Sequence, residues 1–435
     1  MADVQPLRGL RYDLEKVKDL TEVITPPFDV ISPAAQQRYY ERNPYNIIRL
    51  ELGKESSTDD DLNNVYTRAA TTFAEWRLQN VLRQEAQPAY YFYQQRFSYE
   101  GKEYTRTSLL ARVRLEPWSS RVVLPHENTR KKDKEDRLNL LRACSSNFSP
   151  IMSMYDDPQG RIRKLLQQYA QHPEVQIRDE VGEEHILHPV TDEQQLQLIR
   201  DFFAERQIYI ADGHHRYTTA LNYRDEVHQQ RQDMDPMDGV NFVMMALIDI
   251  DDPGMLVLPT HRLLSDLPTE RLQTLTLSHL SEHFTVLEMP ATATKEELQR
   301  RLAQAGEQAP SFVVKTAERT LLLSIDDAGQ QRMQASGHSD AWNKLDVAIV
   351  QKLLFENVLG ITEEDVAAGR YIRYSHETEQ TLQALQNGEA QAVILLNGIP
   401  FQQVRDVAIA DDRMPQKSTY LYPKLISGLV INPLW

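Results

Sequence analysis

A short apolar run, a glycine turn and a helical pattern follow one another directly near the middle of the chain, and few folds accommodate that order. Ile208-Tyr209-Ile210-Ala211 reads as a buried strand, Asp212-Gly213 as a sharp turn, and residues 217–229 as a helix. Short strands and helices alternate in the same way elsewhere along the 435 residues. The pattern therefore predicts a mixed α/β fold.

Local signals in the N-terminal part predict further elements. The runs 89–97 and 104–115 flank a Glu100-Gly101 turn and predict a β-hairpin. Ser32 and Pro33 predict the start of a helix over 34–42. Residues 45–52 alternate toward their end and predict a strand, whereas the aspartates at 59–61 predict the cap of a helix that runs to about Leu82.

The length allows about two to three domains, and changes of pattern divide the chain into four parts. We expect an N-terminal α+β part over 1–160, a part with the glycine turn over 161–265, a small α/β insertion over 266–340, and a C-terminal part over 341–435 that packs on the core.

Composition excludes several classes of protein. A net charge of −15 argues against a nucleic-acid-binding surface, and the single cysteine, Cys144, excludes a disulfide framework and a cysteine zinc cluster. The N-terminus lacks a signal-peptide core, and no apolar stretch approaches the ~20 residues of a membrane span. The expectation is a cytoplasmic protein without nucleic-acid or membrane partners; its oligomeric state stays open, a homodimer included.

The turn after the buried strand concentrates ionisable groups. Unpaired amides and the dipole at the start of a helix favour an anion, and Gly213 permits the sharp turn. Arg216 adds donors for phosphate, Asp212 could cap the helix or hold a cation, and at most one of His214 and His215 faces a ligand. The alternative is structural: Asp212 caps, the histidines satisfy buried groups, and Arg216 pairs with a core carboxylate.

Two other segments carry candidate site residues. His126 and Glu127 end a strand before a charged stretch, where Glu127 could orient a hydroxyl nucleophile and Lys131, Lys132, Lys134 or Arg137 could supply charge. A solvated loop with a surface histidine is the alternative. His261 and Arg262 follow another strand, and they fit either a phosphate site or structural pairing.

The C-terminal segment 414–424 gathers ammonium and hydroxyl groups in an acidic chain. Lys417, Ser418, Thr419 and Lys424 suit an anionic ligand, although ordinary strand alternation explains the aromatic residues between them equally well. The sequence leaves open whether this segment joins the pocket of the Asp212 turn.

The segment Ile210 to Ala220 resembles the glycine, histidine and arginine motif of the ParB/sulfiredoxin superfamily. Together with residues 26–33, 43–51, 125–127 and 414–424, it also resembles a bacterial family of unknown function over nearly the whole chain. The superfamily resemblance implies a ParB/sulfiredoxin-like mixed sheet core and nucleotide phosphates bound at this turn. Its members include sulfiredoxins, ParB-type CTPases, and kinases that phosphorylate free L-serine with ADP or ATP.

Two of these activities fit the residues poorly. Sulfiredoxin chemistry needs a cysteine where this chain has His214, and no basic recognition helix for DNA follows the motif. The resemblance therefore implies a nucleotide-dependent phosphotransferase on a small hydroxyl metabolite, with free L-serine as the specific expectation and Mg²⁺ with ATP or ADP as cofactor.

In that hypothesis each candidate residue has a role. Residues 213–216 would hold phosphates, helped by His261, Arg262 and residues 417–419, and Asp212 would bind magnesium. Glu127, His126, Asp212 and His214 would act in catalysis. Two alternatives remain, a non-catalytic nucleotide- or metabolite-sensing module and a phosphate-ester hydrolase.

Overall fold

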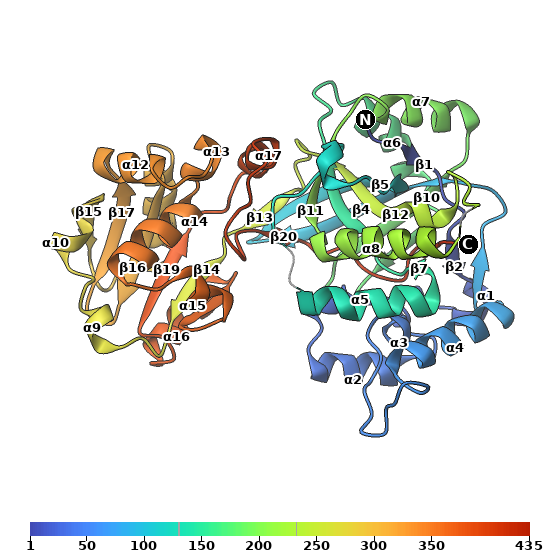
Figure 1. Cartoon of the computed structure of the whole chain (residues 1–435), viewed down its shortest axis with the longest axis horizontal. Coiled ribbons are helices and arrows are strands. Elements are labelled where there is room, and N and C mark those ends of the chain that lie inside the picture. The colour runs from blue at the N-terminus through green and yellow to red at the C-terminus, as the bar shows by residue number, and fades with distance from the viewer. Residues whose placement is uncertain (129–130, 232) are drawn as a thin grey trace. The chain divides into compact units, whose positions relative to one another are not determined.

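The computed structural model describes residues 1–128, 131–231 and 233–435, and of residues 131–134 the backbone alone. It divides into two compact units. Unit 1 comprises Met1–Pro125, Thr129–Met255 and Pro423–Trp435, and unit 2 comprises His126–Asn128 and Leu256–Tyr422. Each unit combines a mixed or antiparallel sheet with helices, which confirms the mixed α/β class (Figure 1).

The main sheet of unit 1 has nine strands among the described residues. Their order is β6 (Val123–Leu124), β11 (Ile208–Asp212), β8 (Ile151–Tyr155), β12 (Phe242–Asp249), β5 (Lys102–Arg114), β4 (Tyr90–Tyr99), β10 (Glu184–Val190) and β9 (Val175–Arg178), with β1 (Val4–Gln5) on β5. β11 pairs in parallel with β6 and antiparallel with β8. The predicted hairpin is confirmed as β4–β5.

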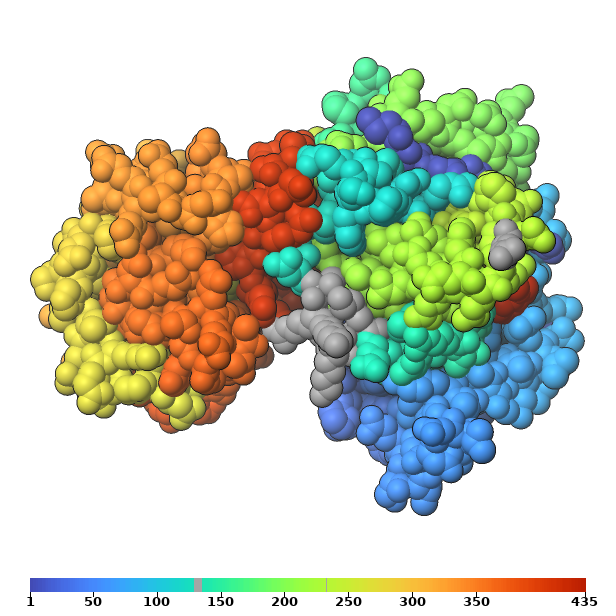
Figure 2. Space-filling model, viewed as in Figure 1, coloured from blue at the N-terminus to red at the C-terminus, as the bar shows by residue number. Residues whose placement is uncertain are grey.

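Helices and two small strand pairs complete unit 1. The helices are α1 (Leu14–Val17), α2 (Pro33–Arg42), α3 (Ile48–Glu51), α4 (Val65–Leu78), α5 (Lys131–Cys144), α6 (Arg161–Gln167), α7 (Glu193–Phe203) and α8 (His214–Gln230). The pairs are β2 (Leu10–Tyr12) with β3 (Leu82–Gln84), and β7 (Ser146–Asn147) with β21 (Asn432–Pro433). The core joins apolar residues of α6, α7 and α8 to one face of β5 and β12. In the space-filling view, α2 to α4 lie within the larger blue area, at the bottom of unit 1 (Figure 2).

The sheet of unit 2 has six strands among the described residues. Their order is β15 (Phe284–Met289), β17 (Thr320–Ile325), β16 (Ser311–Thr316), β19 (Ala392–Leu396), β14 (His261–Leu264) and β18 (Ile372–Ser375). A separate pair joins β13 (Leu256–Leu258) to β20 (Tyr420–Tyr422). The strands that fall within the predicted insertion over 266–340, β15 to β17, share one sheet with strands outside it, and the four-part division stays a prediction.

Short helices surround the sheet of unit 2. They are α9 (Thr269–Leu272), α10 (Leu277–Leu280), α11 (Lys295–Gly306), α12 (Asp327–Gln334), α13 (Asp340–Asn343), α14 (Asp346–Ile349), a π-helix (Val350–Val358), α15 (Glu363–Ala367), α16 (Thr378–Gln386) and α17 (Phe401–Ile409). The core of unit 2 includes apolar residues from α11 and α16 packed against β14, β16 and β19. Among the residues that the structure describes, no helix has both the length and the apolar character needed to cross a membrane.

Two local predictions in the N-terminal part are wrong. Residues 45–52 form the short helix α3 instead of a strand. The Asn46 carboxamide accepts the Ile48 N–H at 3.0 Å and donates to the Glu22 carbonyl at 2.7 Å, which fixes a turn there. Ile47 and Ile48 are fully buried in this helical turn. So short an apolar run fits the periodicity of a strand and of a helix equally well, which is why the sequence pattern misled.

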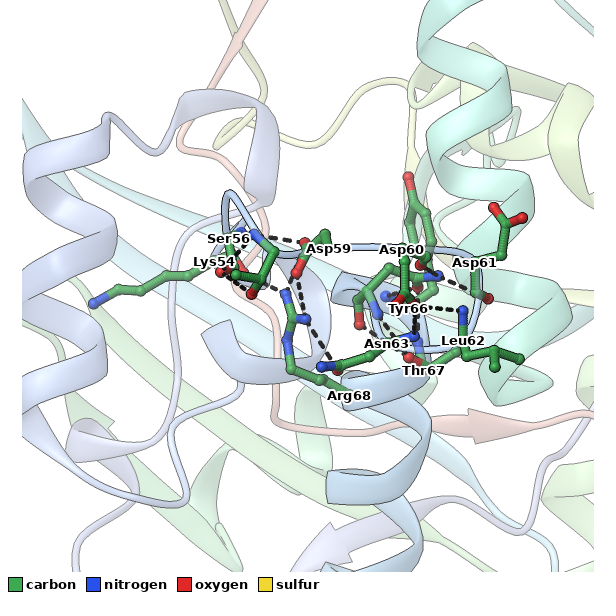
Figure 3. Close-up of polar contacts among 12 residues, drawn as sticks. Lys54, Ser56, Asp59, Asp60, Asp61, Leu62, Asn63, Tyr66, Thr67 and Arg68 are labelled. Carbon is green, nitrogen blue, oxygen red and sulfur yellow. Dashed lines mark hydrogen bonds and ion pairs between the residues drawn. The ribbon is translucent and has the colours of Figure 1, made fainter.

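The predicted aspartate cap of α4 is also wrong. Asn64 is the N-cap, and it forms a capping box with Thr67. Asp59 instead pairs with Arg68 at 2.6 Å, and the Asp60 carboxylate accepts backbone N–H groups of its own loop at 2.7 and 2.8 Å (Figure 3). The aspartates therefore order the loop before the helix, and the helix starts later than predicted.

Candidate functional site

The turn between β11 and α8 has the geometry that the sequence predicts. β11 ends at Asp212 after an irregularity in its pairing, and α8 begins at His214 with Gly213 as its N-cap. Gly213 has a φ of 100°, and as a glycine N-cap it makes no side-chain capping bond to α8. Because a helix N-terminus concentrates partial positive charge, the start of this 17-residue helix favours an anion.

Gly213 is required for more than its backbone angle. A Cβ atom at this position would lie 3.0 Å from both Nε and Nη2 of Arg216. The guanidinium therefore packs directly against the turn, and any larger residue would displace it as well as strain the backbone.

Arg216 ties the turn to the start of β8. Its Nη1 donates to the Pro150 carbonyl at 2.6 Å and to the Ser149 hydroxyl at 3.3 Å, and its Nη2 lies 3.9 Å from the Asp212 carboxylate. The side chain is 14% exposed. Groups of unit 1 therefore hold the guanidinium in place. The structural alternative for Arg216, pairing with a carboxylate, thus describes part of its contacts.

Lys424 completes the site from the far end of the chain. Its ammonium donates to the Asp212 carboxylate at 3.0 Å. Burial alone would raise the pKa of Asp212, but Lys424, Arg216 and His214 together hold that pKa well below its usual range. Two cations, Lys424 and Arg216, thus flank one ionised carboxylate, and these three groups together carry one excess positive charge in an acidic chain.

Two buried side chains of the β4–β5 hairpin hold the backbone that carries Lys424. Arg106 donates to the Pro423 carbonyl at 2.7 Å, and Gln95 donates to the Lys424 carbonyl at 3.1 Å. Arg106 is 1% exposed, and its Nε and Nη1 have no hydrogen-bond partner among the described residues. Burial lowers the pKa of Arg106 to about 10, so it stays protonated at neutral pH. The sequence did not indicate that Arg106 supports Lys424, because Arg106 lies within a strand of the core and far from Lys424 along the chain.

Arg216 lines a small cavity of about 40 Å³ that has both polar and apolar walls. The Ser149 hydroxyl donates to the Glu51 carboxylate at 2.8 Å, and Arg137 donates to the Glu51 carbonyl at 2.9 Å. The cavity is lined by Glu51, Arg137, Leu140, Leu141, Ser146, Asn147, Phe148, Ser149, Ile151, Arg216, Thr219 and Val243. A hydrogen-bonded network therefore supports the guanidinium from the interior.

The two histidines of the turn differ in burial. His214 is 4% exposed, and its carbonyl accepts the Thr218 hydroxyl at 3.0 Å. His215 is half-buried. Their predicted parts in catalysis and phosphate binding stay predictions.

Three of the predicted residues meet in unit 2. The Thr419 hydroxyl lies 3.4 Å from Nε2 of His126 and 3.4 Å from the Glu127 carboxylate, and His126 and Glu127 are 3.9 Å apart. Met414 donates its N–H to the His126 carbonyl at 2.8 Å. The structure thus brings the segment after β6 together with the C-terminal segment, a pairing that the sequence did not predict. Ser418 is buried against the Pro415 carbonyl, and Lys417 is exposed.

His261 and Arg262 are engaged in the sheet of unit 2. Nδ1 of His261 accepts the Leu396 N–H at 3.2 Å, and Nε2 lies 2.9 Å from the Thr378 hydroxyl. Burial, and then Arg262, lower the pKa of His261 to about 3, so it is neutral. Arg262 is 3% exposed and donates to the Thr260 carbonyl. Neither takes part in the function proposed below. The side chains of Lys131, Lys132 and Lys134 lie outside the described residues.

Several solved structures resemble the chain at low identity. Free serine kinase in complex with AMP is 12% identical with a TM-score of 0.36, covering 69% of this chain and 83% of that one. SbnI with a C-terminal truncation, from Staphylococcus aureus, is 13% identical with a TM-score of 0.37, covering 75% and 87%. A conserved hypothetical protein from Pyrococcus furiosus is 13% identical with a TM-score of 0.36, covering 72% and 94%. Likenesses this weak carry no argument about activity.

Sequence comparisons place the chain more firmly. No curated protein matches it. The model of a family described as protein of unknown function, DUF1015, matches residues 4–348, which is well over half of the chain. The chain therefore belongs to the DUF1015 family.

Proposed function

We propose that unit 1 binds the phosphate groups of a nucleotide at the turn between β11 and α8. The observation that carries the proposal is the net positive charge gathered there: Lys424 and Arg216 surround Asp212 at the glycine-started N-terminus of α8. An anion bound here interacts favourably with the helix dipole and with two cations. Because the positions of both cations are already fixed, binding costs little conformational entropy.

Asp212 has a different part in this proposal from the one predicted. Its carboxylate is bound by Lys424 at 3.0 Å and faces Arg216, so it suits a bare magnesium ion poorly. We assign it to positioning Lys424. Mg²⁺ then enters bound to the nucleotide, as is usual for phosphoryl transfer.

The reaction we propose is phosphoryl transfer to a small hydroxyl metabolite, with free L-serine as the first substrate to test. Phosphoryl transfer depends on cations that steady the phosphate oxygens and on a carboxylate that orients the hydroxyl. The sequence-based candidate for that carboxylate is Glu127 of unit 2, and its part in the reaction is tested separately from nucleotide binding by unit 1. Contacts with Thr419 and His126 hold Glu127, and its side chain remains 30% exposed, so a substrate hydroxyl can reach it.

Calorimetry with ATP, ADP and CTP, each with and without Mg²⁺, tests the binding step. Lys424→Met should weaken nucleotide binding by about 10- to 100-fold, the loss expected for one charge-assisted contact. Lys16→Met is the matched control, because Lys16 is an exposed lysine in the last turn of α1 of the same unit. Absence of binding by all three nucleotides, or equal affinity in both variants, contradicts the proposal.

Transfer of labelled phosphate from the bound nucleotide to L-serine tests the reaction. Binding without turnover on any hydroxyl substrate would favour a nucleotide-sensing module. Release of phosphate from phosphoserine without nucleotide would favour a phosphate-ester hydrolase.

A further inference from the structure

The β9–β10 hairpin of unit 1 carries a cluster of potential metal ligands. Asp179, Glu183 and His185 each offer one ligand atom, and these atoms all lie within 4.8 Å of one another. His185 is fully buried, Glu183 is 7% exposed and the Asp179 side chain is 15% exposed. The cluster is therefore enclosed by the protein rather than spread over its surface.

The tight connection between the strands orients Asp179. Oδ1 accepts the N–H groups of Val181 at 3.1 Å and of Glu183 at 2.8 Å. Gly182 permits this turn with a φ of 90°. With Oδ1 engaged in this way, Oδ2 is directed toward His185 and lies 3.3 Å from its Nε2.

Tyr93 orients the His185 ring from the other side. Its hydroxyl lies 2.8 Å from Nδ1, and the two rings stack at 6.0 Å with an interplanar angle of 12°. If Nδ1–H donates to the tyrosine oxygen, Nε2 presents its lone pair to Asp179. Protein metal sites commonly fix a histidine ligand through a hydrogen bond on its second ring nitrogen, and this arrangement has that form.

The charge of the cluster also favours a cation. Two carboxylates lie beside a single imidazole, and the charge of Arg106 also acts on Glu183. Carboxylates and a neutral imidazole are ligands that a divalent metal ion accepts, and such an ion would stabilise the two carboxylates in this buried position.

We infer that Asp179, Glu183 and His185 bind one divalent transition-metal ion of the Zn²⁺ class. A mixture of one imidazole and two carboxylates suits such an ion, and three protein ligands leave a position for water. The separation of 3.3 Å between Nε2 and Oδ2 matches the edge of a tetrahedron with bonds of about 2.0–2.1 Å. The metal site and the proposed nucleotide site have no ligand residue in common, so the test of either can fail alone.

The test uses the full chain after treatment with a chelator. Calorimetry measures binding of Zn²⁺, and visible absorption measures binding of Co²⁺ as a spectroscopic probe. Asp179→Asn removes the anionic oxygen that faces His185 and keeps the side-chain carbonyl that accepts the two turn N–H groups. Glu183→Gln removes the second carboxylate without a change of size. His188→Gln is the matched control, because His188 lies on the same strand and its Nδ1–H donates to the His172 carbonyl instead.

We expect one equivalent of Zn²⁺ to bind the wild-type chain, with cobalt bands typical of low coordination number. Both cluster variants should bind at least about 10-fold more weakly, and His188→Gln should bind normally. Circular dichroism in chelator shows whether each variant is folded. Wild-type affinity in both folded cluster variants, or no Zn²⁺ bound by the wild-type chain, overturns the inference; the cluster is then an Asp–His–Tyr hydrogen-bonded network.

Discussion

Replacing Lys424 by methionine isolates the ion pair on which the candidate site depends. Methionine keeps most of the apolar stem and removes the charge, so packing changes little. Asp212 then loses the partner at 3.0 Å while Arg216, at 3.9 Å, remains. In the folded variant the Asp212 carboxylate stays partly buried, but less positive charge offsets its loss of hydration.

The expected loss of stability follows from the geometry. Unit charges 3.0 Å apart attract by about 5 kcal/mol at an effective dielectric constant of about 20. Desolvation cancels much of this, because the side chains are only 14% and 24% exposed. Removing one partner costs about 3–5 kcal/mol in a fully buried pair and about 0–1 kcal/mol at the surface, so we expect about 2 kcal/mol here.

The loss should depend on pH. The folded-state pKa of Asp212 is lower than its unfolded value, so its contribution to stability is present above an unfolded pKa of about 3.9 and is lost as pH falls toward the folded value. The difference in unfolding free energy between wild type and variant should be full at pH 7 and shrink below about pH 4. Urea unfolding at a series of pH values measures it.

Two results would refute this reasoning. A difference that stays constant from pH 7 to pH 3 would show that methionine acts through packing and not through the ion pair. A variant as stable as wild type at pH 7 would show that the ammonium and Asp212 are not paired in solution. Lys16→Met, at an exposed position, should leave stability unchanged within about 0.5 kcal/mol and serves as the reference.

Three further outcomes are expected. Gly213→Ala should destabilise unit 1 by about 1–3 kcal/mol and weaken nucleotide binding, because a Cβ atom meets the Arg216 guanidinium at 3.0 Å and the backbone has a φ of 100°; thermal unfolding and calorimetry measure both, and unchanged values contradict the geometry. Glu127→Gln should keep nucleotide affinity and lose turnover by at least about 100-fold, as single-turnover assays with L-serine would show; full activity removes Glu127 from the proposal. Burial raises the pKa of Asp252 to about 6, so ionising it costs the folded state on the order of 3 kcal/mol as pH rises from about 4 to 6. Asp252→Asn should flatten that part of the urea-measured stability profile, and an unchanged slope would assign it to other groups.

Local signals were sufficient for the elements that carry the site. The strand, turn and helix around Asp212, the hairpin β4–β5 and the helix begun by Ser32 all form where the sequence predicts them, since periodicity, glycine and N-cap preferences act over a few residues. The same signals failed at residues 45–52, where tertiary contacts of Asn46 selected a helix from a run too short to specify either element.

The sequence by itself determined that a positively charged turn follows a buried strand in an acidic chain. Only the tertiary structure decided which groups complete it: Lys424 reaches Asp212 from 212 positions away, and buried Arg106 and Gln95 hold the backbone that delivers it. It likewise turned the Arg216 guanidinium back against Gly213 and β8. Backbone preferences act within a few residues, whereas the partner of a buried charge is fixed by how distant strands pack, and no local pattern records that choice.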